Sequence, residues 1–172
     1  MIHILRCLIY LALIGASCFV LGRLLPKGMF KADRPPFRLY SWERQGAFYD
    51  RLGIRRWKEK LPDMSAILPR LMPPKKLPRE MSAPVLERMI QETCVAEWIH
   101  GLLCILGFGC VLIWKGVWGW AVSLLYFLGN LPYILIQRYN RPKLIRILQK
   151  VQAREKVYEK CDHFELQHGT GT

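Results

Sequence analysis

The chain has 172 residues, of which 52% are hydrophobic, and a net charge of +13. The hydrophobic residues are collected into long blocks, which favours a membrane protein. The excess of positive charge could also indicate nucleic-acid binding, but the sequence contains no RNA- or DNA-binding fingerprint. Because basic residues flank the apolar blocks, we expect anionic membrane lipids as a partner and no nucleic acid.

Residues 1–25 predict a transmembrane anchor. The central run, residues 7–22, is short, but its flanks bring it near the roughly 20 residues that a bilayer requires. A cleaved signal peptide is the alternative, because residues 15–18 resemble a lipoprotein cleavage site. The apolar run continues through residues 19–21, which a cleaved segment would not need, so we expect an uncleaved anchor.

Residues 26–84 predict a basic, amphipathic and Pro-rich cytoplasmic segment. Trp57 lies in an apolar stripe at helical spacing, with Lys58 and Lys60 beside it. This pattern is typical of a helix in the membrane surface, and a helix packed on protein is the alternative. Six prolines between positions 62 and 84 exclude a continuous helix there.

Residues 85–141 predict a helix that enters a transmembrane hairpin. Two apolar spans, about 99–114 and 117–136, are separated by a break at Lys115-Gly116. Three tryptophans cluster at this tip, where indole rings prefer the membrane interface. Both arms are apolar on every face, which disfavours a soluble hairpin.

Residues 142–172 predict a basic amphipathic helix that begins at Pro142, followed by a polar, disordered tail from Cys161. Basic residues border the apolar stripe of this helix, so we expect it to lie on anionic headgroups. The stripe consists of Leu144, Ile145, Ile147, Leu148 and Val151. The predicted class is therefore an all-α integral membrane protein. It has an N-terminal anchor helix, a basic amphipathic cytoplasmic segment, a transmembrane helical hairpin and an amphipathic C-terminal helix.

The distribution of charge predicts the orientation. Fifteen Lys and Arg residues lie in residues 26–97 and eight in residues 137–172, whereas the hairpin tip carries only Lys115. By the positive-inside rule, we expect a multi-pass protein whose long polar segments are cytoplasmic. The N-terminus and the tip would then lie outside.

The sequence offers little support for a metal site. The six cysteines form no CxxC pair and four lie in apolar stretches, so we interpret them as small apolar side chains rather than disulfides or metal ligands. Glu97-x-x-His100 matches a motif of di-iron bundles, but those sites need a second copy and further carboxylates. We therefore expect no metal and no cofactor.

Glu97 and His100 are the candidate catalytic residues, because three positions apart on a helix they share a face. A carboxylate beside an imidazole can fix its tautomer and make it a better general base. Ionisable groups at membrane depth are costly and point to function, although an interfacial pair that reaches for water is the alternative.

The second arm ends in more polar groups than a membrane helix needs. In a hairpin these groups lie beside Glu97 and His100, and amides with guanidinium groups suit a lipid-linked substrate whose reacting head lies in water. Topology and headgroup binding explain the arginines alone, but they explain the amides poorly. The candidate substrate-binding residues are Glu92 on the first arm and Asn130, Gln137, Arg138, Tyr139, Asn140 and Arg141 on the second.

At these stretches the sequence resembles the glycosyl-4,4'-diaponeurosporenoate acyltransferases of bacterial carotenoid (staphyloxanthin) biosynthesis. The resemblance spans roughly residues 40–150. The matching segments are Glu43-x-x-Gly46-x-Phe48, Arg56-Trp57-Lys58-x-Lys60, Glu92-Thr-x-x-Ala-Glu97-x-Ile-His100 and Asn130-x-Pro132 through Gln137-Arg-Tyr-Asn-Arg-Pro142. It implies an enzyme of the bacterial cell membrane that esterifies a sugar hydroxyl of a glycosylated C30 carotenoid acid with a fatty acyl group.

Our hypothesis is acyl transfer from a fatty acyl thioester to a glycosylated lipid at the cytoplasmic boundary. His100, oriented by Glu97, would take the proton of a sugar hydroxyl. Arg138 or Arg141 would stabilise the oxyanion or bind donor phosphate, while Asn130 and Gln137 hydrogen-bond the sugar. The alternative is a non-catalytic membrane protein that binds a glycolipid or scaffolds other enzymes.

Overall fold

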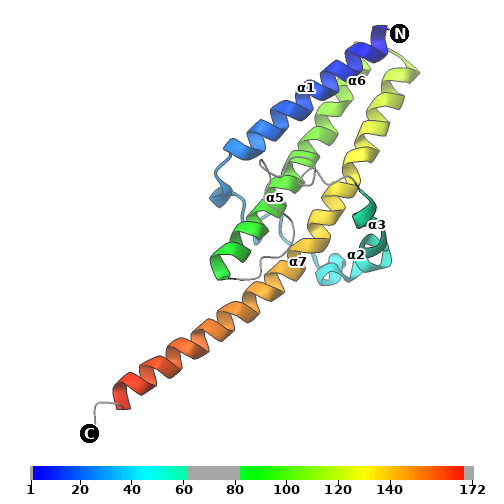
Figure 1. Ribbon diagram of the computed structural model, residues 1–172. Helices are drawn as coiled ribbons and strands as arrows, with labels where there is room; N and C mark the ends of the chain where they lie inside the picture. Colours follow the sequence, from blue (N-terminus) through cyan, green and yellow to red (C-terminus); the bar gives the residue numbers. More distant parts are fainter. Residues whose placement is uncertain (1, 62–81, 169–172) are drawn as a thin grey trace.

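The computed structural model describes residues 2–61 and 82–168, and these residues form helices, turns and connecting segments without a strand (Figure 1). Three helical stretches are long and apolar enough to cross a membrane. They are α1 (Ile2–Leu24), the arm formed by α5 (Ala83–Leu106), η4 (Gly107–Gly109) and α6 (Cys110–Ile113), and α7 (Val117–His168). The described residues thereby confirm the all-α class, and three helical stretches fit the expected membrane spans. The expected linker over residues 62–81 lies outside the described residues.

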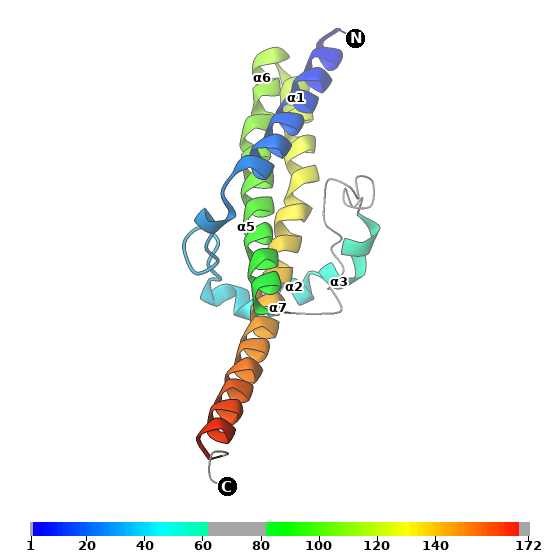
Figure 2. The same cartoon turned by 60° about the vertical axis from the view of Figure 1, so that its left-hand side comes forward.

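The α5–α6 arm and α7 lie side by side as an antiparallel pair (Figures 1 and 2). The chain turns between the end of α6 and the start of α7, at the Lys115-Gly116 break expected from the sequence. The N-terminus lies at the same end of the molecule as this turn, α2 and α3 lie beside the middle of α7, and the C-terminal part of α7 forms the opposite end. At the turn, the rings of Trp114 and Trp118 stack with centroids 6.0 Å apart.

The α5–α6 arm changes to a 3-10 turn at η4, in the middle of its apolar stretch. Such a change leaves carbonyl groups without their helical donors, and the bilayer core supplies no water to satisfy them. Here side chains from the two neighbouring helices supply the donors. The Tyr10 hydroxyl of α1 donates to the Leu106 carbonyl (2.8 Å), and the Ser123 hydroxyl of α7 donates to the Gly107 carbonyl (3.1 Å).

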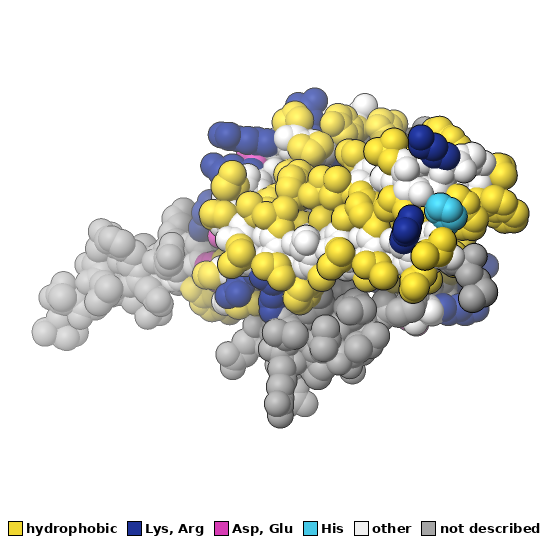
Figure 3. All heavy atoms as spheres, turned by 90° about the horizontal axis from the view of Figure 1, so that it is seen from above, with side chains coloured by type: hydrophobic (Ala, Val, Ile, Leu, Met, Phe, Trp, Pro, Cys, Tyr) yellow, Lys and Arg dark blue, Asp and Glu magenta, His cyan; other side chains and the backbone are white. Residues whose placement is uncertain are grey.

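Much of the apolar surface of the three long helices is exposed, as a lipid-facing surface should be. On α1 alone, the exposed large side chains are Ile2, Ile4, Leu5, Leu8, Ile9, Leu13, Val20 and Leu24. Hydrophobic side chains also cover most of the described face in Figure 3. The cysteines that the structure describes, Cys7, Cys18, Cys94, Cys104 and Cys110, are buried and free. They fill space between helices, as the sequence predicted.

The segment around Trp57 does not form one amphipathic helix. It folds into four short pieces: η2 (Ser41–Gly46), α2 (Ala47–Arg51), α3 (Ile54–Trp57) and η3 (Lys58–Lys60). Gly46 and Gly53 interrupt the helix because both have positive φ, at 100° and 64°. Trp57 packs beside a buried cluster of Tyr49, Ile54 and Tyr139, so the alternative of packing on protein describes this segment.

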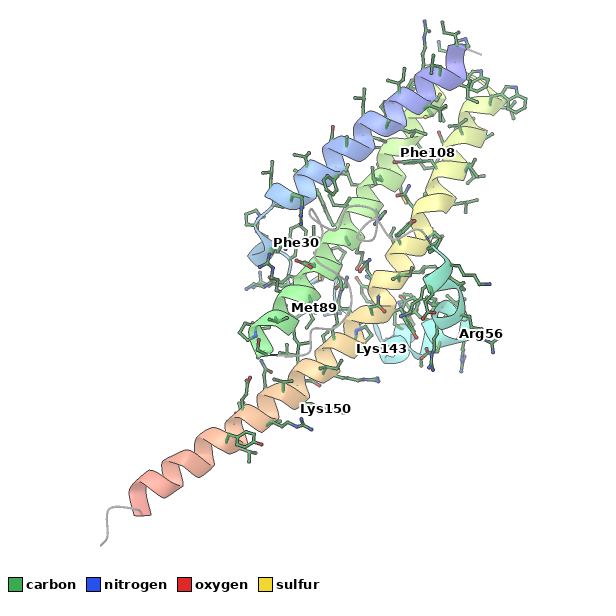
Figure 4. All side chains as sticks on the ribbon, viewed as in Figure 1. Phe30, Arg56, Met89, Phe108, Lys143 and Lys150 are labelled. Carbon is green, nitrogen blue, oxygen red and sulfur yellow. The ribbon has the colours of Figure 1, made fainter. Side chains whose placement is uncertain are left out.

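Two cations of this region lie against the ring of Tyr139. Lys58 Nζ lies 5.2 Å from the ring centroid, and Lys143 Nζ lies 3.4 Å from it. Figure 4 shows Arg56 on the outer side of α3 and Lys143 on the adjoining part of α7. Lys60 is exposed. The short elements therefore expose Arg55, Arg56 and Lys60, while Lys58 and the Tyr49–Ile54 cluster lie against α7.

The expected helix start at Pro142 and disordered tail from Cys161 are corrected by α7. This helix continues through Pro132 and Pro142 to His168, a length of 52 residues. Each proline removes only one helical hydrogen bond, and packing on the rest of the helix outweighs that loss. At about 1.5 Å per residue α7 is about 80 Å long, so part of it must lie outside a hydrocarbon core of roughly 30 Å.

The apolar stripe after Pro142 packs on protein rather than on headgroups. Leu144 is buried against Leu86 and Ile90 of α5, and the other stripe residues pack around this cluster. Met89 of α5 lies on the same side, next to α7 (Figure 4). The reason is that α5 begins at Ala83, well before the apolar span, so its first turns run alongside the stripe. The packed pair of helices therefore continues past the apolar spans of the hairpin.

Candidate active site

His100 of α5 and Asn130 of α7 meet across the hairpin. Their Nδ1 and Oδ1 atoms are 2.9 Å apart. The other amide atom, Asn130 Nδ2, donates to the Tyr126 carbonyl at 2.9 Å, which turns Oδ1 toward the imidazole. Because an amide oxygen can only accept, Nδ1 of a neutral His100 carries the proton and Nε2 carries the lone pair. This tautomer is the one that a general base needs at Nε2.

Tyr133 of α7 covers one face of the same imidazole. The two rings are stacked, with centroids 4.7 Å apart and planes at 9°. Tyr133 follows Asn130 by three positions, so both side chains come from neighbouring turns on one side of α7. His100 is thus held by a hydrogen bond at its edge and a ring at its face.

Next to this pair lies a network of buried charges centred on Arg138. Its Nε donates to Glu97 Oε1 at 2.8 Å, and its Nη1 donates to Glu43 Oε1 at 2.7 Å. Its Nη2 donates to the Pro36 carbonyl at 2.6 Å. One guanidinium therefore connects the first arm of the hairpin, the second arm and the segment that precedes them.

Arg141 completes the network and is fully buried. Its Nε donates to Thr93 Oγ1 (2.9 Å), its Nη1 to the Phe37 carbonyl (2.6 Å), and its Nη2 to the Thr93 carbonyl and to Glu97 Oε2. Two carboxylates and two guanidinium groups thus alternate from Glu43 to Arg141, with no net charge. In the described residues no buried side-chain polar atom lacks a partner. This pairing is what makes buried charges tolerable.

Glu43 is ionised in this setting although its side chain is fully buried. The Tyr49 hydroxyl donates to Oε1, and the Tyr40 backbone N–H donates to Oε2 at 2.6 Å. Burial alone would raise the pKa of Glu43, but these hydrogen bonds and the charge of Arg138 lower it below its ordinary value. Burial and the neighbouring carboxylate raise the pKa of Tyr49, so the phenol stays protonated as a donor.

The geometry differs from the expected Glu97–His100 pair. Both oxygens of Glu97 accept hydrogen bonds from arginines, and the Nδ1 partner of His100 is Asn130. The antiparallel register explains this, because it brings two arginines to the face of Glu97. A charge-assisted hydrogen bond to an arginine is stronger than a contact with a neutral imidazole. The arginines expected to face the substrate are therefore held by the protein itself.

The other candidate residues are spread around this centre. Glu92 forms an ion pair with Lys27 and lies 3.5 Å from Arg88 Nε. Tyr139 is buried in a cluster with Tyr49 and Ile54. The half-buried side chains of Gln137 and Asn140 form no hydrogen bond with the described part of the chain. Among the side chains that the structure describes, in residues 2–43, 46–61 and 82–158, no three His, Cys, Asp or Glu residues gather as metal ligands would.

Sequence reasoning did not assign Tyr133 or Thr93 to the site, and it gave Glu43 no role of its own. Glu43 lies in a polar segment, and nothing in the local sequence pattern indicates that its carboxylate is buried. The available signal was that Glu43 belongs to one of the segments that carry the family resemblance. The spacing of Tyr133 to Asn130 could have indicated a role in the site, but the same residue is also consistent with an apolar position of the span.

The fold and site define a membrane protein with a candidate base at the end of an apolar helical hairpin. The sequence profile of the glycosyl-4,4'-diaponeurosporenoate acyltransferase family matches residues 31–150. The chain belongs to this family and is an acyltransferase. Proteins of that name from Staphylococcus aureus strains RF122 and USA300 are each 27% identical over 154 residues, which cover 86% of this chain and 89% of the relative. No solved structure matches the chain.

Proposed function

We propose that the protein transfers a fatty acyl group from an acyl thioester to a sugar hydroxyl of a glycosylated lipid. The relatives are named for glycosyl-4,4'-diaponeurosporenoate, and we take this compound or a close analogue as the acceptor. The observation that carries the proposal is the His100–Asn130 pair, which sets the imidazole tautomer of a general base. The pair lies where the apolar hairpin meets the charged network. A lipid-linked sugar needs such a boundary, because its chain is apolar and its sugar is polar.

In the proposed reaction, His100 Nε2 takes the proton of the sugar hydroxyl while its oxygen attacks the thioester carbonyl carbon. The tetrahedral intermediate then collapses, the carbon–sulfur bond breaks, and the sulfur leaves as a thiolate. The imidazolium returns the proton to the thiolate. The products are the sugar ester and a free thiol, and His100 is again neutral.

The surrounding residues take different roles from those first expected. Arg138 and Arg141 hold the two arms in register, since binding an oxyanion would cost them buried acceptors. Asn130 positions His100, because both atoms of its amide are engaged. We assign sugar or oxyanion binding to Gln137, which lies two turns from Asn130 on the same side of α7.

We place the reaction at the cytoplasmic face of the bacterial cell membrane. The short elements before α5 lie beside the middle of α7, away from the turn, and the later part of α7 extends to the end opposite the turn (Figure 1); both segments are rich in Lys and Arg. The positive-inside rule puts that end in the cytoplasm, where acyl thioesters are available. The exposed apolar flanks of the hairpin would then hold the lipid chains.

The test is acyl transfer by the purified protein in detergent or lipid. We expect release of one free thiol for each ester formed when an acyl-CoA and a glycosylated carotenoid acid are supplied together. The same lipid without its sugar is the control and should give neither product. Binding of the glycolipid without thiol release, from acyl-CoA or from acyl carrier protein, would instead favour a binding or scaffold protein.

A further inference from the structure

We propose that Tyr133 is a positioning residue that fixes the plane of the His100 imidazole, an inference that rests on the proposed function. The evidence is the parallel stack of the two rings, with centroids 4.7 Å apart and planes at 9°. Asn130, three positions earlier, holds the edge of the same imidazole. Asn130 and Tyr133 therefore form one cradle on α7 for a single side chain of α5.

Two constraints are needed because one hydrogen bond leaves the ring a degree of freedom. The Nδ1 to Oδ1 contact fixes one atom of His100, and the ring can still tilt about the line of that bond. A nearly parallel ring stacked on the imidazole blocks the tilt. Together they fix the direction in which Nε2 presents its lone pair, and small errors in such a direction slow proton transfer strongly.

The stack also favours the charged state that the reaction creates. When Nε2 takes the sugar proton, His100 becomes an imidazolium. A cation over the face of a tyrosine ring is stabilised by the negative charge of that face. The neutral amide of Asn130 stabilises an imidazolium less than a carboxylate would. The tyrosine face therefore supplies a larger share of the stabilisation of the charged ring.

The charged network aligns Asn130 and Tyr133 of α7 with His100 of α5. Glu97 lies three positions before His100, and its carboxylate is held by Arg138 and Arg141 of α7. These two ion pairs set the register between the helices. A slip of one turn, about 5.4 Å, would carry Asn130 and Tyr133 past His100.

The experiment compares kcat and KM of purified variants in the acyl-transfer assay. Tyr133→Leu removes the ring and should lower kcat about tenfold or more, with both KM values changed less than about twofold. Tyr133→Phe keeps the ring and should stay within about threefold of the unmodified protein. Phe127→Leu, another aromatic residue of α7, is the matched control and should leave kcat unchanged.

Three results would overturn the inference: unchanged kcat in Tyr133→Leu, an equal loss in Tyr133→Phe, or a change confined to KM. If Tyr133→Leu does not fold, Tyr133→Met replaces it, because Met fills the space without a ring. His100→Gln separates the two proposals. If His100→Gln is inactive while Tyr133→Leu keeps full kcat, only the role of Tyr133 fails. If His100→Gln is active, the proposed base itself is wrong.

Discussion

Arg138 Nη1 and Glu43 Oε1 lie 2.7 Å apart although 95 positions separate the two residues in the chain. This ion pair fastens the segment before the hairpin to the second arm, and Glu97 extends it to the first arm. Since the Glu43 side chain is fully buried, the pair is shielded from water and salt. It is the long-range contact on which the arrangement of the candidate site depends.

Glu43→Gln should destabilise the protein by about 3 kcal/mol, because it leaves the Arg138 guanidinium with one buried counter-charge instead of two. The shape of the side chain is preserved, so the loss reports charge rather than packing. Thermal unfolding in detergent measures it. Glu59→Gln, the same change at an exposed position, should alter stability by less than about 0.5 kcal/mol. Equal effects of the two changes would show that the Glu43 charge is unimportant.

The same pair predicts how stability depends on pH. The pKa of Glu43 is lowered in the folded protein, so its contribution is complete above its ordinary value near 4.5 and is lost as the pH falls through the lowered value. The pKa of Tyr49 is raised, so its contribution is complete below its ordinary value of 10 and is lost as the pH rises above it.

A profile of the unfolding midpoint against pH tests both contributions, through its fall at low pH (the acid limb) and its fall at high pH (the alkaline limb). Glu43→Gln should flatten the acid limb. Tyr49→Phe should flatten the alkaline limb, whereas Tyr158→Phe, at an exposed position, should leave it unchanged. An alkaline limb that persists in Tyr49→Phe would contradict the assignment.

Arg141→Lys should reduce stability by about 2 to 3 kcal/mol while the folded protein keeps its kcat. A lysine cannot reach all the acceptors on Thr93, Phe37 and Glu97 that the guanidinium serves. The exposed Arg154→Lys is the control and should change neither quantity. The reverse pattern, an unchanged midpoint with kcat reduced about a hundredfold, would identify Arg141 as an oxyanion donor instead.

The orientation can be tested by thiol labelling of whole cells. In a chain without its native cysteines, Lys115→Cys at the turn should react with an impermeant maleimide added outside. Lys60→Cys should react only after the cells are opened, because Lys60 is exposed in the basic segment that the positive-inside rule puts in the cytoplasm. Labelling of Lys60→Cys in intact cells would reverse the proposed sidedness.

The sequence predicted the three apolar helices and the break at Lys115-Gly116, because long apolar blocks have few structural solutions in a bilayer. The pattern predicted a new helix at Pro142, but α7 is continuous there because Leu144 packs on Leu86 and Ile90 of α5. It also favoured a surface helix at Trp57, where two glycines with positive φ produce short turns. These outcomes depend on tertiary contacts that no local pattern contains.

For the site, the sequence brought the correct helices together but not the correct partners. His100 and Asn130 were both named, yet their hydrogen bond depends on the register of α5 against α7. That register is set by ion pairs of Glu97 with two arginines, which spacing within one helix cannot predict. The burial of Glu43 depends in turn on a segment that folds back from the other side.

The most direct test of the account is kcat for acyl transfer by His100→Gln, with His3→Gln as the control at the far end of the molecule. A general base contributes about 10² to 10⁴ in rate, so His100→Gln should lower kcat at least about a hundredfold with little change in KM. His3→Gln should match the unmodified protein. If His100→Gln transferred the acyl group within about threefold of the unmodified rate, His100 would not be the base.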